Sequence, residues 1–288
     1  MQELLLPDPV APGIYGRGRV FEAVLEGLGS AISALDVAAR ETMRFPPVIS
    51  RGTVERCGYV HSFPHLLGTI HAFAGDDAAH ARLLHRVEAG EDWGDQQTLT
   101  DLVLTPAACY ALYPRMTGVL PAMGRTIDLE SWCFRQEPSR SPERMRSFRM
   151  RELVRLGAPA VVHQWRDEWL ERAEAFLRSL GLEPVVVPAS DPFFGAVARF
   201  MSVSQRDQEL KFELIVDVGA GARAAVMSCN YHREHFGDAF AIRLTDGGVA
   251  HTACVGFGLE RIALGLLAAH GAQPERWPET VRSVLRLN

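Results

Sequence analysis

The sequence lacks a long hydrophobic run. Nowhere do its 288 residues approach the roughly 20 consecutive apolar residues that a membrane-spanning helix needs. The N-terminal stretch MQELLLPDPVAPG is too short and too acidic to be a secretory signal peptide. We therefore expect a cytoplasmic protein without a membrane segment.

Cysteine is scarce, and positive charge is not in excess. The five cysteines are odd in number, widely spaced and without a CxxC pair: Cys57, Cys109, Cys133, Cys229 and Cys254. This usage argues against a disulfide framework and favours free thiols in a reducing compartment. A net charge of -5 excludes a general nucleic-acid-binding coat and leaves room only for a local basic patch. No internal repeat or low-complexity linker divides the chain.

The segments that are present predict an α+β protein. Periodic apolar residues predict helices over 21–35 and 162–180, and the polar segment 76–92 also reads as helical. ETMRFPP reads as a strand that ends at its prolines, and DLVLTPAACYALYPRM as a buried strand running into a helix or turn near Cys109.

Further strands are predicted along the second half of the chain. The candidates are EPVVVPAS, KFELIVDV, AAVMSCNY, AFAIRLT and GVAHTACV. After the last of these, GFGLERIALGLLAAHG predicts a glycine turn and an apolar helix. Many strands without regular helical alternation favour an antiparallel sheet flanked by helices.

Residues 133–153, CFRQEPSRSPERMRSFRMREL, hold six arginines and three glutamates in and around a loop. If 133–137 and 148–152 pair with Cys133 opposite Glu152, alternation of side chains fills one face of the hairpin. That face carries Cys133, Arg135, Glu137, Phe148, Met150 and Glu152.

The chemistry of this face suits a nucleotide. Arginine binds phosphate bidentately, a phenylalanine ring stacks on a base, and a carboxylate accepts a hydrogen bond from an exocyclic amine. The loop residues Arg140, Arg144 and Arg146 would then meet the outer phosphates. Composition alone leaves a second interpretation open, a solvated hairpin held by salt bridges.

The hairpin and the downstream GFGLERIALGLL together resemble the class II aminoacyl-tRNA synthetases. CFRQE…FRMRE resembles their motif 2, GFGLERIAL resembles motif 3, and the segment 21–47 is a looser match to motif 1. A closer resemblance is to the amino acid:[carrier protein] ligases, homologues of the catalytic cores of atypical seryl-tRNA synthetases. The stretches that resemble this family are YVHSFPHLLGTIHAF, LTPAACYALYP, DPFFG, QELKFEL and NYHREHFG.

The resemblance implies an ATP-dependent reaction. A small amino acid, glycine or alanine, is activated as an adenylate and passed to the phosphopantetheine thiol of a carrier protein. Arg135 and Arg261 would be the catalytic residues. Arg135 would bind the α-phosphate, and Arg261 would bind the γ-phosphate and cover one side of adenine. Glu137 would bind the adenine amino group, Phe148 would stack on adenine, and Arg144 would bend the triphosphate back. Mg²⁺ is expected with ATP. The position of the magnesium-binding glutamate in seryl synthetases corresponds to the neighbourhood of Ala225 in this sequence, and Glu213 is an alternative magnesium ligand.

The resemblance also implies one zinc ion per chain, bound by Cys109, Glu152 and Cys254. Two thiolates and a carboxylate leave one tetrahedral position open, which the amino group of the substrate would take. Cys109 as a buried small apolar residue is the structural alternative. Cys133 is a rival ligand because the register above places it opposite Glu152. The histidines of NYHREHF, His232 and His235, are expected to form hydrogen bonds and not to bind metal.

Assembly and partners follow from the same resemblance. Motif 1 predicts a homodimer, and 1–288 is expected to be a single catalytic domain without a tRNA-binding arm or anticodon domain, so tRNA is not the expected acceptor. Arg166 and Arg172, expected to be exposed on the helix 162–180, are candidates for contact with an acidic carrier. Two rival functions are a truncated seryl-type synthetase with residual tRNA charging and a non-catalytic, synthetase-like regulatory protein.

Overall fold

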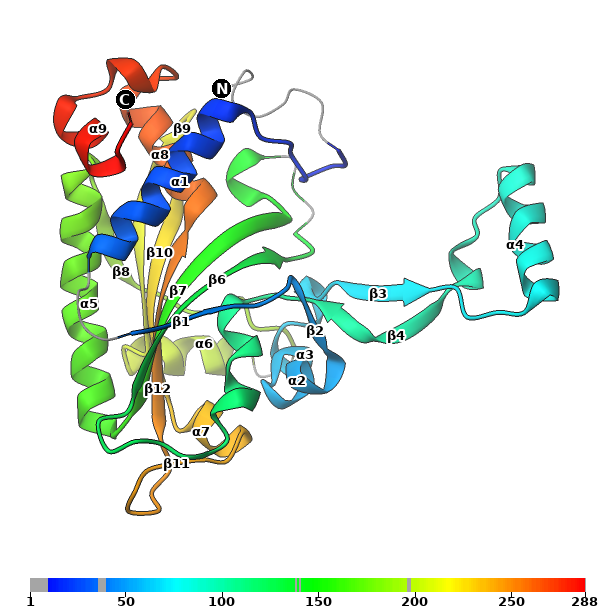
Figure 1. Ribbon diagram of the computed structural model, residues 1–288, viewed down its shortest axis with the longest axis horizontal. Helices are drawn as coiled ribbons and strands as arrows, with labels where there is room; N and C mark the ends of the chain where they lie inside the picture. Colours follow the sequence, from blue (N-terminus) through cyan, green and yellow to red (C-terminus); the bar gives the residue numbers. More distant parts are fainter. Residues whose placement is uncertain (1–9, 36–39, 138, 140, 196–197, 288) are drawn as a thin grey trace.

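The computed structural model describes residues 10–35, 40–137, 139, 141–195 and 198–287 (Figure 1). Its centre is a seven-stranded sheet in which β1 pairs in parallel with β6 and every other neighbouring pair is antiparallel. The strands, in spatial order, are β1 (Glu41–Arg44), β6 (Arg125–Phe134), β7 (Ser147–Gly157), β12 (His251–Gly258), β10 (Ala222–Arg233), β9 (Lys211–Gly219) and β8 (Val185–Pro188). The predicted α+β class with an antiparallel sheet flanked by helices is confirmed.

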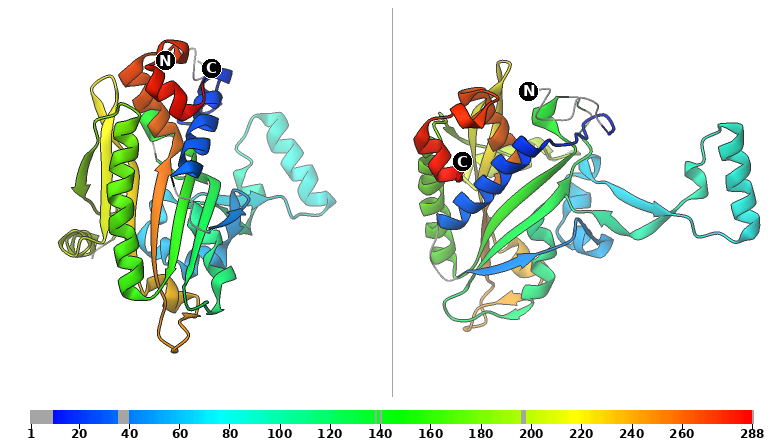
Figure 2. Two further views of the ribbon diagram at one scale, coloured as in Figure 1. Left: turned by 60° about the vertical axis from the view of Figure 1, so that its left-hand side comes forward. Right: turned by 45° about the horizontal axis from the view of Figure 1, so that its top comes forward.

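One face of the sheet is covered by the longer helices (Figures 1 and 2). These are α1 (Arg19–Ala34), α5 (Pro159–Ser179) and α8 (Leu259–His270), with α9 (Glu279–Leu285) beside α1. The apolar stripe predicted for 162–180 is confirmed, since Trp169, Ala173 and Leu177 are fully buried in the main core. Gly181, at φ 72°, follows the end of α5 in the left-handed conformation that favours glycine.

The opposite face of the sheet is covered by shorter elements, some of which form a second core with the strands. They are α2 (Arg51–Arg56), α3 (Tyr59–Ser62), η3 (Ala108–Ala111), η4 (Tyr113–Met116), α6 (Ala198–Asp207) and α7 (His235–Ala239). The ring of Tyr113 stacks on that of Phe236 with centroids 3.9 Å apart. Because side chains alternate along a strand, β7 sends its even-numbered residues to this face and its odd-numbered residues toward α1.

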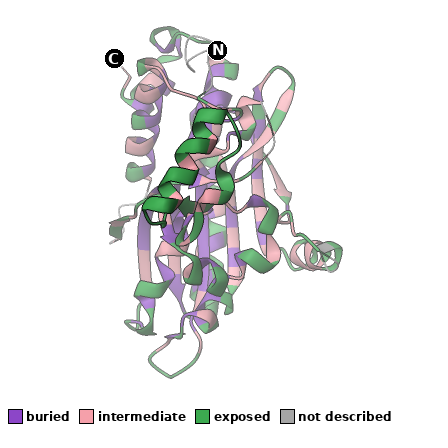
Figure 3. Cartoon of the chain, turned by 90° about the vertical axis from the view of Figure 1, so that its right-hand side faces the viewer, coloured by how far each residue is buried: buried purple, intermediate pink, exposed green. Residues whose placement is uncertain are grey.

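An arm extends from the body of the protein (Figures 1 and 2). It consists of β3 (Thr69–Ala72), α4 (Asp77–Ala89) and β4 (Thr98–Leu104), and β2 (Val48–Ser50) completes its three-stranded sheet. No residue of α4 is buried, and Figure 3 shows the helix as largely exposed. The prediction of a buried strand beginning at Asp101 is therefore wrong: β4 buries only Val103, because the strand lies in the arm and not in the core sheet.

The predicted register of the β6–β7 hairpin is also wrong. Cys133 lies opposite Phe148, and Glu152 lies opposite Leu129, so the strands are shifted by four residues from the expected pairing. An even shift leaves each side chain on its own face, whereas an odd shift would exchange the faces. The predicted face of the hairpin is consequently correct although its partners are not.

Three smaller differences complete the fold. The predicted glycine turn is absent from the described residues, since β12 continues through Gly258 and α8 begins at Leu259. AFAIRLT forms only the two-residue strand β11 (Ile242–Arg243), which pairs with β5 (Gly118–Val119). The short helical turns η1 (Pro64–Leu66), η2 (Gly94–Gln96), η5 (Pro142–Arg144) and η6 (Pro274–Arg276) lie in connections. Within the described ranges, no helix combines the length and apolar character needed to cross a membrane.

Candidate active site

A cavity of ≈ 440 Å³ opens on the second face of the sheet. Its floor is formed by β7, β12, β10 and β9, and its walls include η3, α3 and the loop between β6 and β7. The cavity brings together Cys109, Arg135, Glu152, Cys254 and Arg261, which the sequence analysis singled out. Glu137 and Phe148 also line it.

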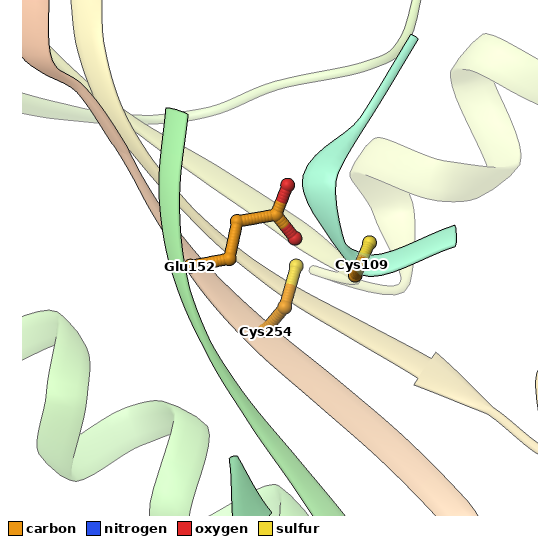
Figure 4. Close-up of side chains that lie close together, drawn as sticks. All are labelled: Cys109, Glu152 and Cys254. Atoms are coloured by element: carbon orange, nitrogen blue, oxygen red, sulfur yellow. The ribbon is translucent and has the colours of Figure 1, made fainter. Parts of the chain in front are cut away.

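The three predicted metal ligands converge at one end of this cavity (Figure 4). Cys109 comes from η3, Glu152 from β7 and Cys254 from β12, and one ligand atom of each lies within 4.8 Å of the others. All three residues are buried. Cys254 and Glu152 lie on neighbouring strands, so the sheet positions two of the ligands and the turn η3 brings the third over them.

Glu152 has the hydrogen bonding expected of a ligand. One carboxylate oxygen, Oε1, accepts a hydrogen bond of 3.0 Å from the backbone N–H of Ala108. The other, Oε2, is buried and has no hydrogen-bond partner within the described part of the chain. Burial raises the pKa of Glu152 to about 7. A buried carboxylate oxygen without a partner costs free energy, and a cation between it and the two sulfurs would satisfy it.

The thiol of Cys254 lies in surroundings that favour the thiolate. The hydrogen bond with Cys109 is the largest cause that lowers the pKa of Cys254 well below its ordinary value, and His232 and Asn230 add to it. Asn230 Nδ2 donates to Cys254 Sγ at 3.3 Å, and His232 Nε2 lies 3.6 Å from that sulfur. The same bond with Cys254, followed by burial, raises the pKa of Cys109. This donor set of soft sulfur and carboxylate oxygen fits zinc.

The two histidines form hydrogen bonds, as predicted. His232 Nδ1 lies 3.0 Å from Thr252 Oγ1, and His235 Nε2 lies 3.1 Å from the carbonyl oxygen of Cys57. The sequence analysis missed Asn230, which is the cross-strand partner of Cys254 in the β10–β12 ladder. Only this pairing identifies Asn230 as a neighbour of the metal ligands.

Cys133 is not positioned as the rival ligand that the predicted register made it. It faces the same side of the sheet but lies opposite Phe148, four residues from Glu152 along β7. Its buried thiol lies 4.0 Å from the carbonyl oxygen of Ser131. Across the described ranges, the one group of His, Cys, Asp and Glu side chains close enough to share an ion is Cys109, Glu152 and Cys254.

Two arginines at the other end of the cavity are held by backbone carbonyl groups. Arg135 donates from Nε to the carbonyl of Pro106 at 3.1 Å, and its guanidinium carbon lies 5.4 Å from the centre of the Phe148 ring. Arg261 donates to the carbonyls of Glu143, at 2.7 Å, and Ala225, at 3.1 Å. Neither guanidinium forms a salt bridge with any described carboxylate, so their charge is available to an anionic ligand.

The predicted loop arginines are arranged less uniformly. Arg144 is exposed at the rim, where Nη1 lies 3.4 Å from Glu137 Oε2. Arg146 donates from Nε to the carbonyl of Glu137 at 3.1 Å, so it supports the loop. The prediction for Arg140 lies outside the described residues.

An ion cluster on the cavity wall, with Lys211 buried and its two carboxylate partners half-buried, was not predicted. Lys211 Nζ lies 2.6 Å from Asp191 Oδ1 and 2.9 Å from Glu213 Oε1. Burial alone would raise the pKa of Asp191, but Lys211 and Gln205 lower it below its ordinary value. The candidate magnesium ligand Glu213 is thus already paired with Lys211. Twenty residues separate Asp191 from Lys211, and no local sequence pattern links them.

The suggested exposure of Arg166 on α5 is wrong. Its side chain is 3% exposed and donates to the carbonyl of Glu209 at 2.6 Å and to Asp167 at 2.7 Å. Arg172 is about half exposed, with its guanidinium 5.5 Å from the Trp169 ring. Both lie on the helix that packs against the face of the sheet opposite the cavity.

Comparison with known proteins shows which enzymes are similar to this chain in sequence and fold. No protein-family model matches the chain. Two proteins of Bradyrhizobium diazoefficiens are similar to it over nearly its whole length. Amino acid–[acyl-carrier-protein] ligase 1 is 44% identical over 278 residues, which cover 96% of this chain and 85% of the ligase. Ligase 2 is 43% identical over 290 residues, which cover 100% of this chain and 87% of the ligase.

More distant relatives are seryl-tRNA synthetases. The type-2 serine–tRNA ligase of Methanopyrus kandleri is 29% identical over 270 residues, 84% of this chain and 50% of that protein. The M. kandleri enzyme in its crystal structure with A. aeolicus tRNASec superposes with a TM-score of 0.81 at 25% identity, over 98% of this chain and 58% of that one. The Pyrococcus horikoshii synthetase complexed with ATP has a TM-score of 0.71 at 15% identity, over 97% and 58%, and shows the shared fold alone.

The full-length similarity and the shared fold agree with the motifs, whose residues the structure assembles around one cavity. The chain belongs to the family of amino acid–[acyl-carrier-protein] ligases, enzymes related to the type-2 seryl-tRNA synthetases.

Proposed function

We propose that this chain activates glycine or alanine with ATP and transfers the aminoacyl group to the phosphopantetheine thiol of a carrier protein. The observation that carries the proposal is a single cavity that holds the Cys109–Glu152–Cys254 group together with two arginines that lack a carboxylate partner among the described residues. The printed names of the two Bradyrhizobium relatives support the choice of acceptor.

The proposed reaction has two balanced steps. A carboxylate oxygen of the amino acid attacks the α-phosphorus of ATP, and pyrophosphate leaves. The thiol of the carrier then attacks the carbonyl carbon of the adenylate, a thioester forms, and AMP leaves with the electron pair of the broken C–O bond. No cysteine of this chain is needed as a covalent intermediate.

The nucleotide end of the cavity stabilises charge. Arg135 would bind the α-phosphate, where negative charge develops during the first step. Phe148 and Arg261 would bind the two sides of adenine, and Glu137 would accept a hydrogen bond from its amino group. Arg261 would also reach the γ-phosphate, and Arg144 at the rim would contact the bent triphosphate. Mg²⁺ would accompany ATP.

The amino acid end of the cavity selects a small substrate. Cys109, Glu152 and Cys254 would hold one zinc ion, which supplies an open coordination position for the amino group of the substrate. The rings of Tyr110 and Phe236 line the cavity, and Tyr113 lies stacked on Phe236. We infer that these bulky rings beside the ligands would favour a substrate with a small side chain, as in glycine or alanine.

Two further parts of the proposal concern assembly. We propose that 1–288 acts as one catalytic domain, because strands from both halves of the chain, β1 and β6 to β10 together with β12, form the seven-stranded central sheet. We also propose a two-fold homodimer through α1 and β1. β1 is an edge strand of that sheet with mostly exposed residues, and closed two-fold dimers are the commonest soluble oligomers.

The test measures both half-reactions. The protein is incubated with ATP, Mg²⁺ and either amino acid, and exchange of labelled pyrophosphate into ATP is followed. Mass spectrometry then compares a carrier in its holo form, with phosphopantetheine, and in its apo form. We expect exchange with glycine or alanine and label only on the holo carrier.

The rival functions predict other results. Label on bulk tRNA and on neither carrier would identify a seryl-type synthetase, the alternative that the 29% identical M. kandleri relative favours. Absence of exchange with glycine, alanine and serine alike would indicate a non-catalytic, ligand-binding protein.

A further inference from the structure

A buried carboxylate, Glu260, lies at the proposed nucleotide end of the cavity and forms part of its lining. Glu260 is the residue before Arg261 in the first turn of α8, and its side chain is 3% exposed. Its Oε2 accepts a hydrogen bond of 2.7 Å from the backbone N–H of Arg149, and its Oε1 accepts one of 3.1 Å from Arg149 Nε. Arg17 Nη2 lies 3.1 Å from the same Oε1.

The end of the β12–β7 ladder explains why a hydrogen-bond acceptor such as the Glu260 carboxylate is needed at this position. The ladder between β12 and β7 ends at the pair Gly258–Met150, and the chain then turns into α8. The backbone N–H of Arg149, one residue further along β7, lies beyond this last pair. Glu260 accepts the hydrogen bond there and joins the first turn of α8 to β7. A negative charge in the first turn of a helix is also favoured by the helix dipole.

The connection continues into α1. Arg149 Nη1 and Nη2 bind the two carboxylate oxygens of Glu22 at 2.7 and 2.8 Å. The ring of Trp132, the cross-strand partner of Arg149, has the guanidinium carbons of Arg17 and Arg149 at 4.5 and 4.9 Å from its centre. Two arginines thus face two glutamates, and the ionic network links α1, β7 and α8.

The network adjoins both sides of the proposed adenine site. Phe148 precedes Arg149, and Arg261 follows Glu260, and both line the cavity. Because Glu260 binds the backbone of Arg149, it determines how far the α8 residue Arg261 lies from the β7 residue Phe148. Neighbouring side chains on a strand point to opposite faces, so Arg149 acts on the nucleotide site through the backbone.

We infer that Glu260 and Arg149 are positioning residues that set the gap between Phe148 and Arg261, and that Glu22 connects this gap to α1. The inference rests on the proposed function, since it takes the gap to hold adenine. A displacement of about 1 Å in such a site is enough to lose up to about a hundredfold in rate. The network therefore makes the affinity for ATP depend on how α1 packs against the sheet.

The experiment replaces Glu260 with the isosteric amide. Glu260→Gln keeps the volume but removes the charge and one acceptor. We expect it to weaken ATP binding, measured by calorimetry, by about tenfold. The KM for ATP should rise in parallel, whereas the KM for the amino acid and the zinc content should stay within twofold of wild type. Glu22→Gln, at the outer end of the network, should have a smaller effect of the same kind.

A matched control separates positioning from general destabilisation. Asp128→Asn breaks a second buried ion pair on the same side of the sheet, with Arg151, two residues further along β7. It should lower the melting temperature and leave ATP affinity unchanged, because Arg151 can still donate to Gly29 and Ser33 and so keeps α1 in place. If Glu260→Gln does not fold, Arg149→Lys takes its place, because lysine keeps the backbone hydrogen bond and the charge but loses the paired contacts with Glu22.

Phe148→Ala distinguishes failure of this inference from failure of the proposed function. If Phe148→Ala leaves ATP affinity unchanged, the gap does not hold adenine and the proposed nucleotide site is wrong. If Phe148→Ala weakens ATP binding but Glu260→Gln behaves like Asp128→Asn, only the positioning role is overturned. Equal changes in the KM for ATP and the KM for the amino acid would overturn it as well.

Discussion

Both faces of the β6–β7 hairpin carry arginines and carboxylates, but the two faces differ in how far these charges are paired with one another. On the α1 face, Arg151 is paired with Asp128, and Arg149 is paired with Glu22 and Glu260. On the cavity face, Arg135 has no carboxylate partner in the described part of the chain, and Glu152 Oε2 has no partner there at all.

The difference shows where a ligand belongs. A buried charge is tolerated in a fold when another charge or hydrogen bond compensates it, as on the α1 face. A charge left without such a partner marks a place where a substrate or ion would supply one. Of the arginines in 133–153, Arg149 and Arg151 are therefore compensated by carboxylates of the protein itself, whereas Arg135 is the one that we propose meets a ligand.

The largest expected effect is on the α1 face of the hairpin. Arg151→Met should lower the free energy of unfolding by about 3 kcal/mol, because Asp128 would remain buried without its closest cation. Urea denaturation measures this loss. Pyrophosphate exchange per folded molecule should stay within a few-fold of wild type, and a loss of exchange as large as that of a cavity variant would contradict the separation of the two faces.

The next effect is on the cavity face. Arg135→Ala should remove at least about 2.7 kcal/mol of transition-state stabilisation, a hundredfold in rate, because Arg135 is proposed to bind the α-phosphate. The rate of exchange at saturating ATP measures it, with unfolding free energy as the control. Exchange close to wild type in this variant would show that Arg135 is not the α-phosphate ligand.

The buried cysteines allow a comparison within the cavity face. Wild type should contain about one zinc per chain, and Cys109→Ser and Cys254→Ser should each lose at least about tenfold in zinc affinity, since each removes a thiolate ligand. Elemental analysis after dialysis measures the content. Cys133→Ser is the matched control, a buried cysteine on the same face that should retain zinc. Retention in Cys109→Ser with loss in Cys133→Ser would transfer the site to Cys133.

The proposed dimer through α1 and β1 leads to a prediction about the oligomeric state. Sedimentation at micromolar concentration should give twice the chain mass of 31.8 kDa. Thr42→Lys, on the exposed edge strand β1, should raise the monomer fraction by placing like charges near the two-fold interface. A wild-type monomer of 31.8 kDa would disprove the proposed interface.

The smallest effect concerns the rim of the cavity. Transfer to the holo carrier should fall several-fold as ionic strength rises from about 0.05 to about 0.5 M, because exposed rim arginines such as Arg144 would meet acidic residues of the carrier. Pyrophosphate exchange without the carrier is the control and should change less. Salt-independent transfer would show that this contact is not electrostatic.

Sequence alone determined the features that depend on local periodicity and on motifs. Alternation along β7 placed Phe148 and Glu152 on one face irrespective of the register, since an even shift preserves the face. The apolar stripe of α5 predicted its buried residues in the same way. The motifs identified Cys109, Glu152 and Cys254, although they lie far apart along the chain, because the family resemblance supplied their proximity.

Only the tertiary structure decided which residues contact one another across the fold. The loop between β6 and β7 is long enough to permit several registers, so only the folded sheet could set Cys133 opposite Phe148. Arg166 has the sequence context of a solvent-exposed residue, yet Glu209, 43 positions away, holds it in a buried site. Which arginines are paired and which are left for a ligand depends on residues from α1, α8 and β6, and no local pattern encodes contacts over such separations.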